Sequence, residues 1–460
     1  MSLDSEARPA ARPTGTLIAS TLIAALGGLL FGFDTAVISG TTEALRSVYD
    51  LSGFGLGFTV ASALIGTILG SLVVGRPADV FGRRRVLFTI AVLYFVSALG
   101  SALAWDWWSF LFFRFIGGIG VGGASVVSPM YIAEISPAAL RGRLVAVTQF
   151  NIVFGILLAF FSNYLIAGLE LGAGEWRWMF GVEALPAAAF FLLLFLTPES
   201  PRWLMARRRE TEARSVLARL GTDAGGIDEE IAAIQASLDL VHHRLEEPFF
   251  QAAYRRPILL AVAIAAFNQL SGINALMYYS PAIFRMAGAG QGSALLQTVM
   301  VGGTNLLFTM AAMSVIDRVG RRRLMLAGSV GYIVSLTATA WAFYRYGTDF
   351  TPTGSLVVLG GLLLFIASHA FGQGAVIWVF ISEIFPNRVR ARGQALGSFT
   401  HWFMAAAISW TFPMIAQASG GHAFAFYAVM MVLQLVWVLR VMPETKGVPL
   451  EDIQKRLGIA

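Results

Sequence analysis

Three ionisable side chains lie inside stretches that are otherwise apolar: Asp34, Arg114 and Glu183. A charge near the centre of a bilayer costs on the order of 2.5–3.5 kcal/mol on insertion scales. Such a group is tolerated when it faces a protein interior, takes a partner of opposite charge, or binds a proton. We therefore interpret Asp34 as a proton-binding carboxylate that is neutral when protonated and pairs with Arg114 when deprotonated. A permanent structural ion pair is the alternative interpretation.

A second group of polar side chains consists of amides inside apolar stretches, namely Gln149, Asn268, Gln269, Asn274 and Asn305. Amides both donate and accept hydrogen bonds, and aromatic rings cover the apolar face of a sugar, so such side chains suit a sugar site. Other candidates for this site are Phe31, Trp378, His401 and Trp402. Single amides in membrane helices more often join one helix to another. Because five amides are expected around one central cavity, we favour sugar binding.

The composition indicates an integral membrane protein. Hydrophobic residues make up 57% of the chain and charged residues only 13%, whereas about a quarter of a soluble domain is charged. The absence of cysteine excludes disulfides and thiolate metal sites. No nucleophile–base pair or metal-ligand set is apparent in the sequence, so we expect no enzymatic activity, no cofactor and no metal. The net charge of +6 lies mostly in short arginine clusters, which are typical of membrane topology signals rather than nucleic-acid binding.

The apolar stretches predict an all-α polytopic protein with twelve transmembrane helices, since about 20 residues cross a bilayer. In the first half we expect spans at 16–39, 54–75, 86–104, 109–132, 144–168 and 179–197. In the second half we expect spans at 257–284, 294–316, 323–344, 355–382, 394–418 and 421–441. Arginine clusters follow the second, fourth, eighth and tenth spans, so the positive-inside rule places these loops and both termini in the cytoplasm.

Three motifs occur twice in the same order. Asp79-Val-Phe-Gly-Arg-Arg-Arg85 recurs as Asp317-Arg-Val-Gly-Arg-Arg-Arg323. The Glu-Ile-x-Pro motif at 134–137 recurs at 383–386, and the Pro-Glu pair at 198–199 recurs at 443–444. This repetition predicts two related six-helix bundles, at 16–199 and 256–442, with the substrate site between them near the membrane midplane.

The remaining segments are short. Residues 1–15 are expected to form an N-terminal tail and 443–460 a C-terminal tail, and the first span is expected to be retained because no signal-cleavage site follows it. Residues 200–255 join the two bundles. Ser200 followed by Pro201 is typical of a helix start, and we expect two or three short amphipathic helices in this linker rather than a regulatory domain.

At these motifs the chain resembles the sugar porter family of the major facilitator superfamily. The resemblance extends from Leu17 to Gly447 and includes Gly75–Arg85, Arg114-Phe-Ile-Gly-Gly-Ile-Gly-Val-Gly122 and Pro198-Glu-Ser-Pro-Arg202. In the second half it includes Gln269-Leu-Ser-Gly-Ile-Asn274, Ser382-Glu-Ile-Phe-Pro386 and Pro443-Glu-Thr-Lys-Gly447. Within the family the chain is most similar to bacterial proton-coupled xylose- and glucose-type members. The resemblance matches Asp34, Arg114 and Glu183 to the coupling group, most of the amides and tryptophans above to sugar contacts, and Tyr278 and Tyr279 to an extracellular gate.

The repeated charged motifs predict a cytoplasmic latch of arginine–carboxylate pairs that holds the two bundles together when the transporter faces outward. Its expected members are Asp79, Arg83, Arg84, Glu134, Arg143, Glu199, Asp317, Arg321, Arg322, Glu383, Arg392 and Glu444. In the alternative interpretation, the arginines only set the topology. Pro77 and Val80 depart from the family pattern, which puts the strength of the first-half latch in doubt.

Together these features predict a proton-coupled symporter of a hexose or pentose monosaccharide that works by alternating access, as a monomer in the cell (inner) membrane. Its partners are the sugar, the proton and the lipid bilayer. The alternatives are a passive sugar uniporter and, less favoured, a transporter-like sugar sensor. Departures from the family at Asn268, Ala375 and His401 leave the identity of the sugar open.

Overall fold

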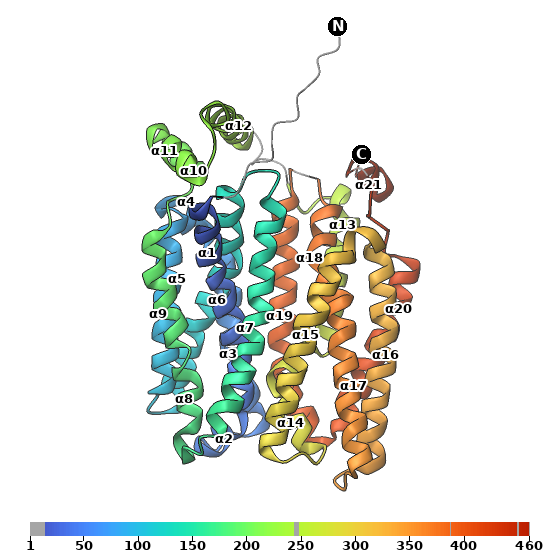
Figure 1. The fold of residues 1–460 in the computed structure, drawn as a ribbon. Helices are drawn as coiled ribbons and strands as arrows, with labels where there is room; N and C mark the ends of the chain where they lie inside the picture. Colours follow the sequence, from blue (N-terminus) through green and yellow to red (C-terminus); the bar gives the residue numbers. More distant parts are fainter. Residues whose placement is uncertain (1–13, 243–247, 387, 449, 460) are drawn as a thin grey trace.

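The computed structural model describes residues 14–242, 248–386, 388–448 and 450–459, and these contain helices but no strands. Most of the expected N-terminal tail, residues 1–13, lies outside the described residues. Two groups of long helices stand side by side, one formed by the first half of the chain and one by the second (Figure 1). The all-α fold with two bundles is therefore confirmed.

The first bundle comprises nine α-helices. They are α1 (Gly15–Val37), α2 (Thr42–Val48), α3 (Gly53–Val73), α4 (Gly75–Phe81), α5 (Arg83–Ala102), α6 (Trp107–Ile135), α7 (Arg141–Ala167), α8 (Glu175–Gly181) and α9 (Ala184–Leu193). The second bundle comprises α13 (Arg255–Leu270), α14 (Ile273–Met286), α15 (Gln291–Val319), α16 (Arg321–Tyr346), α17 (Pro352–Phe371), α18 (Gln373–Ile384), α19 (Arg390–Ala418) and α20 (Gly420–Arg440).

Eleven of the helical segments in the described part of the chain are long and apolar enough to cross a membrane. The remaining expected span, 394–418, is also one helix, the 29-residue α19, but it is too polar to meet the same criterion. Arg390, Arg392 and His401 are among its polar residues. This polarity is tolerated because much of α19 packs inside the protein, against α3 and α13.

Two of the expected spans are broken near their middles. Gly272 separates α13 from α14 and has a φ angle of 86°, a left-handed conformation that glycine adopts without steric cost. Gly372 separates α17 from α18. Backbone breaks at membrane depth are tolerated only where they are buried in protein or line a cavity, so these two breaks indicate the position of a site.

Short helices lie at both ends of the bundles. The described residues of the linker include the α-helices α10 (Pro201–Ala206), α11 (Glu210–Leu220) and α12 (Ala224–His242). Helix α21 (Leu450–Leu457) lies at the same end, which we call the linker end (Figure 1). Ser200 caps α10 by accepting a hydrogen bond from the Trp203 N–H, as the Ser-Pro pair predicts. The opposite end, where α2, α8 and α14 lie, is called the far end.

Helices inside the first bundle approach closely at glycines. A methyl group on Gly32 of α1 would overlap the Ile152 carbonyl oxygen of α7, and one on Gly28 would lie 2.9 Å from the Thr148 carbonyl oxygen. Glycines on α1 therefore permit the close packing of this helix against α7.

The two bundles touch mainly toward the far end. There α3 packs against α19 and α7 against α15, and the rings of Phe54 and Phe58 lie 5.2 and 5.0 Å from the Trp410 ring. Toward the linker end, α7 and α15 are mostly exposed or half-buried, and Arg141 and Arg143 are exposed. The bundles therefore meet at the far end and separate at the linker end.

Candidate functional site

The first bundle contains a buried ion pair between α1 and α6. The Arg114 Nη1 atom lies 2.6 Å from Asp34 Oδ1, and its Nη2 atom donates to the Asp34 carbonyl oxygen at 3.1 Å. The two side chains are each only 2% exposed. A methyl group on Gly117 would overlap Ser97 Oγ and lie 3.2 Å from Asp34 Oδ1, so this glycine leaves the space that the carboxylate occupies.

Glu183 and Tyr94 complete this cluster. Glu183 lies at the break between α8 and α9, is 1% exposed, and is within electrostatic reach of both Asp34 and Arg114. Among the described residues, its Oε1 atom and the Tyr94 hydroxyl have no hydrogen-bond partner. The cluster thus holds one guanidinium, two carboxyl groups and spare hydrogen-bonding capacity, which is what a proton-binding site requires.

Across the interface, the second bundle presents a group of amides at the α13–α14 break. Gln269 Nε2 donates to Asn268 Oδ1 at 3.0 Å, and Asn274 Nδ2 donates to Gln269 Oε1 at 2.9 Å. The ring nitrogens of His401 on α19 lie 3.3 Å from Gln269 Nε2. Gln269 thus contacts two other amides and an imidazole, an arrangement that can bind several hydroxyl groups at once.

Aromatic rings surround these amides. Trp378 of α18 and Trp402 of α19 lie 5.1 and 4.9 Å from the His401 ring. Phe31 of α1 lies 5.7 Å from Trp402, so this contact joins the two bundles one turn from Asp34. The structure therefore brings Phe31, both tryptophans and His401 to one place.

The other predicted contact residues lie around the same interface. Gln149 is half-buried on α7, and Asn305 is 6% exposed on α15, the helix that packs against α7. Tyr278 of α14 is buried and within electrostatic reach of Asp34 and Arg114. Tyr279 is buried and donates to the Ser409 carbonyl oxygen at 3.0 Å. The Asp34–Arg114 pair of the first bundle thus lies close to α14, the helix of the second bundle that follows the break after Gln269.

Equivalent ion pairs occur at the linker end of each bundle. Arg83 binds Glu134 through two hydrogen bonds of 2.8 and 2.9 Å, and Arg321 binds Glu383 at 2.8 and 3.2 Å. Asp79 and Asp317 lie 3.1 and 3.0 Å from the same arginines. Each of these pairs joins helices of one bundle. In this conformation Glu134 and Glu383 therefore bind these arginines, which lie far from them in the sequence, and the latch between bundles stays a prediction.

The two Pro-Glu motifs cap the helices that carry these arginines. Glu199 accepts a hydrogen bond from the backbone N–H of Arg84 at 3.1 Å, and Glu444 accepts from those of Arg321 and Arg322 at 3.0 and 3.1 Å. Burial raises the pKa of the Glu199 carboxyl, and its backbone hydrogen bonds oppose that rise. Glu199 thus fixes its loop to the first turn of α5, and Glu444 fixes its loop to the first turn of α16.

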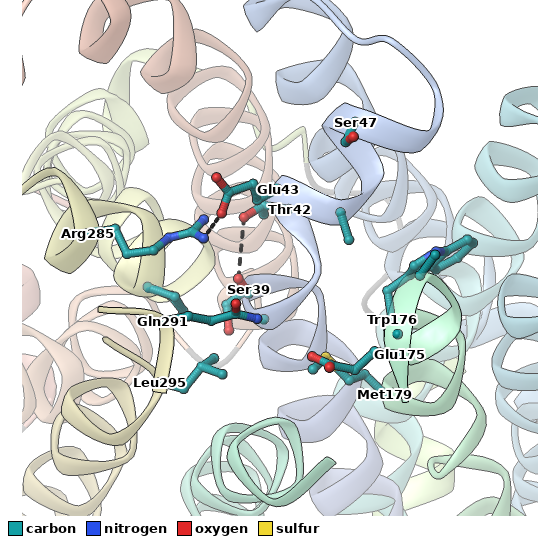
Figure 2. A pocket seen from close by; sticks show the side chains of 15 residues that line it. Ser39, Thr42, Glu43, Ser47, Glu175, Trp176, Met179, Arg285, Gln291 and Leu295 are labelled. Atoms are coloured by element: carbon teal, nitrogen blue, oxygen red, sulfur yellow. Dashed lines mark hydrogen bonds and ion pairs between the residues drawn. The ribbon is translucent and has the colours of Figure 1, made fainter. Parts of the chain in front are cut away.

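At the far end, one ion pair that the sequence did not predict joins the two bundles. Glu43 of α2 pairs with Arg285 of α14 beside a pocket of about 370 Å³ that is also lined by Ser39, Glu175 and Gln291 (Figure 2). Glu43 lies on the short helix between two spans, and Arg285 lies in the last turn of α14. The sequence alone does not say which of these segments meet. The pair adds a polar contact to the closed far end.

The model of the family of sugar (and other) transporters matches residues 20–457. The chain belongs to this family. A D-xylose-proton symporter of Escherichia coli (strain K12) is 40% identical to this sugar transporter over 94% of each chain. An arabinose-proton symporter of Bacillus subtilis (strain 168) is 36% identical over 96% of this chain and 95% of its own.

A solved structure has the same fold. The partially occluded inward-open conformation of the xylose transporter XylE from E. coli matches 95% of this sugar transporter and 100% of its own chain, with a TM-score of 0.84 and 38% identity. The match confirms the major facilitator fold, and the family membership identifies a transporter rather than an enzyme. The roles of individual residues stay predictions.

Proposed function

We propose that this sugar transporter is a proton-coupled monosaccharide symporter that works by alternating access, with the sugar bound between the bundles and Asp34 as the proton carrier. The proposal rests mainly on the buried Asp34–Arg114 pair, which lies beside Tyr278 of the opposite bundle. The names of the relatives, which are symporters of xylose and arabinose with protons, support it.

Coupling follows from the change of charge on Asp34. When Asp34 is ionised, its pair with Arg114 holds α1 against α6. When Asp34 is protonated, the attraction weakens, and Arg114 can turn toward Glu183, whose Oε1 atom is without a hydrogen-bond partner among the described residues. The packing of α1, which includes the Phe31–Trp402 contact, then changes with the proton. Sugar and proton therefore affect the same interface.

The available energy is sufficient for one carboxylate. One proton moving down a potential of 100 mV contributes about 2.3 kcal/mol, which corresponds to roughly 50-fold accumulation of a neutral sugar. One proton per sugar is thus enough to drive accumulation, so a single proton-binding aspartate, Asp34 on α1, is sufficient.

The linker end is proposed to face the cytoplasm of a bacterial inner membrane. The clusters at Arg83–Arg85 and Arg321–Arg323 lie there, in agreement with the positive-inside rule. With this orientation, the conformation described above is inward-facing, and the arginine–glutamate groups at the linker end come together when the transporter turns outward. The outward-facing state would then exchange the far-end contacts for linker-end contacts.

The decisive experiment uses proteoliposomes and a panel of radiolabelled pentoses and hexoses, with and without a pH gradient. We expect concentrative uptake of at least one sugar and alkalinisation of the outside medium when sugar is added. In Asp34→Asn, accumulation should fall from about 50-fold to none, while counterflow exchange of the sugar persists.

The matched control is Asp50→Asn, an exposed aspartate at the far end with a φ angle of 49°, a conformation that asparagine also tolerates. This variant should accumulate sugar like the wild type. Non-concentrative uptake by the wild-type protein that is independent of pH would instead identify a uniporter with a structural Asp34–Arg114 pair.

A further inference from the structure

A second polar cluster lies inside the second bundle, and the coupling scheme does not use it. The Tyr332 hydroxyl of α16 lies 2.6 Å from His369 Nδ1 of α17 and 3.1 Å from Gln373 Oε1 of α18. Gln373 Nε2 donates to Gln434 Oε1 of α20, and Gln434 Nε2 donates to Ser329 Oγ at 2.9 Å. The cluster spans the break at Gly372 and joins four helices.

His369 faces an interior space rather than lipid. It continues the stripe of Val358, Leu362 and Phe365, which repeats at helical spacing along α17 and is at most 1% exposed. The lipid-facing side of the helix is marked by Leu356 and Leu364, which are 66% and 43% exposed. Although it lies on the buried stripe, His369 is only half-buried. Its free surface therefore lines a space within the protein.

That space adjoins the predicted sugar site. A methyl group on Gly374 would lie 3.3 Å from His369 Nε2, so the Nε2 edge of the ring faces the start of α18, one turn before Trp378. His369 and His401 are close enough to interact electrostatically, and His401 contacts both Trp378 and Gln269. The Nδ1 edge is turned away from this space, toward Tyr332.

The hydrogen-bond chain determines which ring nitrogen bears the proton. Ser329 Oγ donates to the Met325 carbonyl oxygen at 2.7 Å and so accepts from Gln434. Gln434 in turn accepts from Gln373, whose own oxygen then accepts from the Tyr332 hydroxyl. Because a hydroxyl has a single proton, the Tyr332 oxygen is left to accept from His369.

The neutral imidazole is consequently protonated on Nδ1 and has an unprotonated Nε2 atom. We propose that His369 Nε2 accepts a hydrogen bond from one hydroxyl group of the bound monosaccharide and is a specificity-determining contact, with Tyr332 as its positioning residue. The inference rests on the proposed sugar-transport function. It adds an obligatory acceptor to a site whose amides can serve as donor or acceptor, so one sugar hydroxyl must donate at this position.

The test measures counterflow KM in proteoliposomes for D-xylose, D-glucose and their monodeoxy analogues. In the wild type, one analogue should bind about fivefold more weakly than its parent, since a neutral hydrogen bond contributes about 0.5–1.5 kcal/mol. In His369→Asn, the amide nitrogen takes the place of Nδ1 and retains a donor to Tyr332. In this variant the KM of the parent sugar should rise about fivefold, and the deoxy analogue should then have the same KM as its parent.

Two further variants sharpen the result. His369→Gln, whose amide reaches the position of Nε2, should keep the discrimination. In Tyr332→Phe, Nδ1 of His369 has no acceptor, so the ring proton can move to Nε2. This variant should therefore reduce the discrimination between the parent sugar and its deoxy analogue, and it provides the test if His369→Asn does not fold. His422→Asn, an exposed histidine at the far end, is the matched control and should change nothing.

The inference is overturned if discrimination among the analogues is the same in wild type, His369→Asn and Tyr332→Phe, or if KM rises equally for every sugar. Counterflow does not need proton coupling, so failure of symport leaves this test intact. A protein that moves no sugar at all would instead contradict the proposed function.

Discussion

The two bundles use the same membrane depth for different chemistry. Tyr94 in the first bundle and Tyr332 in the second lie at the same distance after their repeated Asp-x-x-Gly-Arg-Arg-Arg motifs, and both are fully buried. Around Tyr94 the neighbours are ionic, and among the described residues its hydroxyl has no partner. Around Tyr332 the neighbours are neutral, and its hydroxyl is hydrogen-bonded to His369 and Gln373.

This difference suggests that the two clusters have different functions. Unpaired groups beside Asp34 allow a charge to change partner at low cost, which suits a site that binds and releases a proton. The closed chain from His369 to Ser329 instead fixes the orientation of each donor and acceptor, because every member depends on the next. Such rigidity suits recognition of a sugar. Mutations in the Asp34 cluster and mutations in the chain from His369 to Ser329 should therefore affect different functions and differ in the size of their effects.

The largest effect is expected from Arg114→Met, which leaves buried carboxylates without their cation. Removing one partner of a buried ion pair typically costs about 3–5 kcal/mol, so the thermal unfolding temperature in detergent should fall sharply. The exposed Arg46 supplies the control, Arg46→Met, which should unfold like the wild type. If Arg114→Met were as stable as that control, the first cluster would not depend on charge pairing.

A smaller effect should separate the two tyrosines. Tyr332→Phe leaves His369 Nδ1 and Gln373 Oε1 without the hydrogen bond that each makes to the hydroxyl, which should cost about 1–3 kcal/mol. Tyr94→Phe removes a hydroxyl that has no partner among the described residues, so its cost should be close to zero. Thermal unfolding of the two variants side by side tests the comparison, and equal destabilisation would refute it.

The smallest effect is expected from Gln434→Leu. Gln373 Nε2 loses its acceptor, while Ser329 keeps its bond to the Met325 carbonyl oxygen, so the expected loss is about 1 kcal/mol. Accumulation driven by the proton gradient should be unchanged, because the coupling cluster is in the other bundle. Gln417→Leu, at an exposed position on α19, is the control. A loss of coupling in Gln434→Leu would show that the division between bundles is not valid.

Much of the site was accessible from the sequence because membrane burial makes polar residues conspicuous. Asp34, Arg114 and Glu183 are expensive inside apolar spans, so their presence alone indicated a shared interior, and the structure brings them together. His369 was missed because it occurs singly on an apolar helix and the other members of its cluster come from three other helices. The far-end pair of Glu43 and Arg285 was missed because Glu43 lies between two spans and Arg285 lies at the end of one, where a charge is not costly and so carries little information.

The sequence by itself determined the membrane location, the helical spans and the two-fold repeat, because hydrophobicity, span length and repeated motifs are local properties of the chain. It also limited which charges must be buried. Only the tertiary structure decided which glutamate binds which arginine at the linker end, which end of the bundles is closed, and which nitrogen of His369 contacts Tyr332. Those outcomes depend on contacts between residues far apart in the chain.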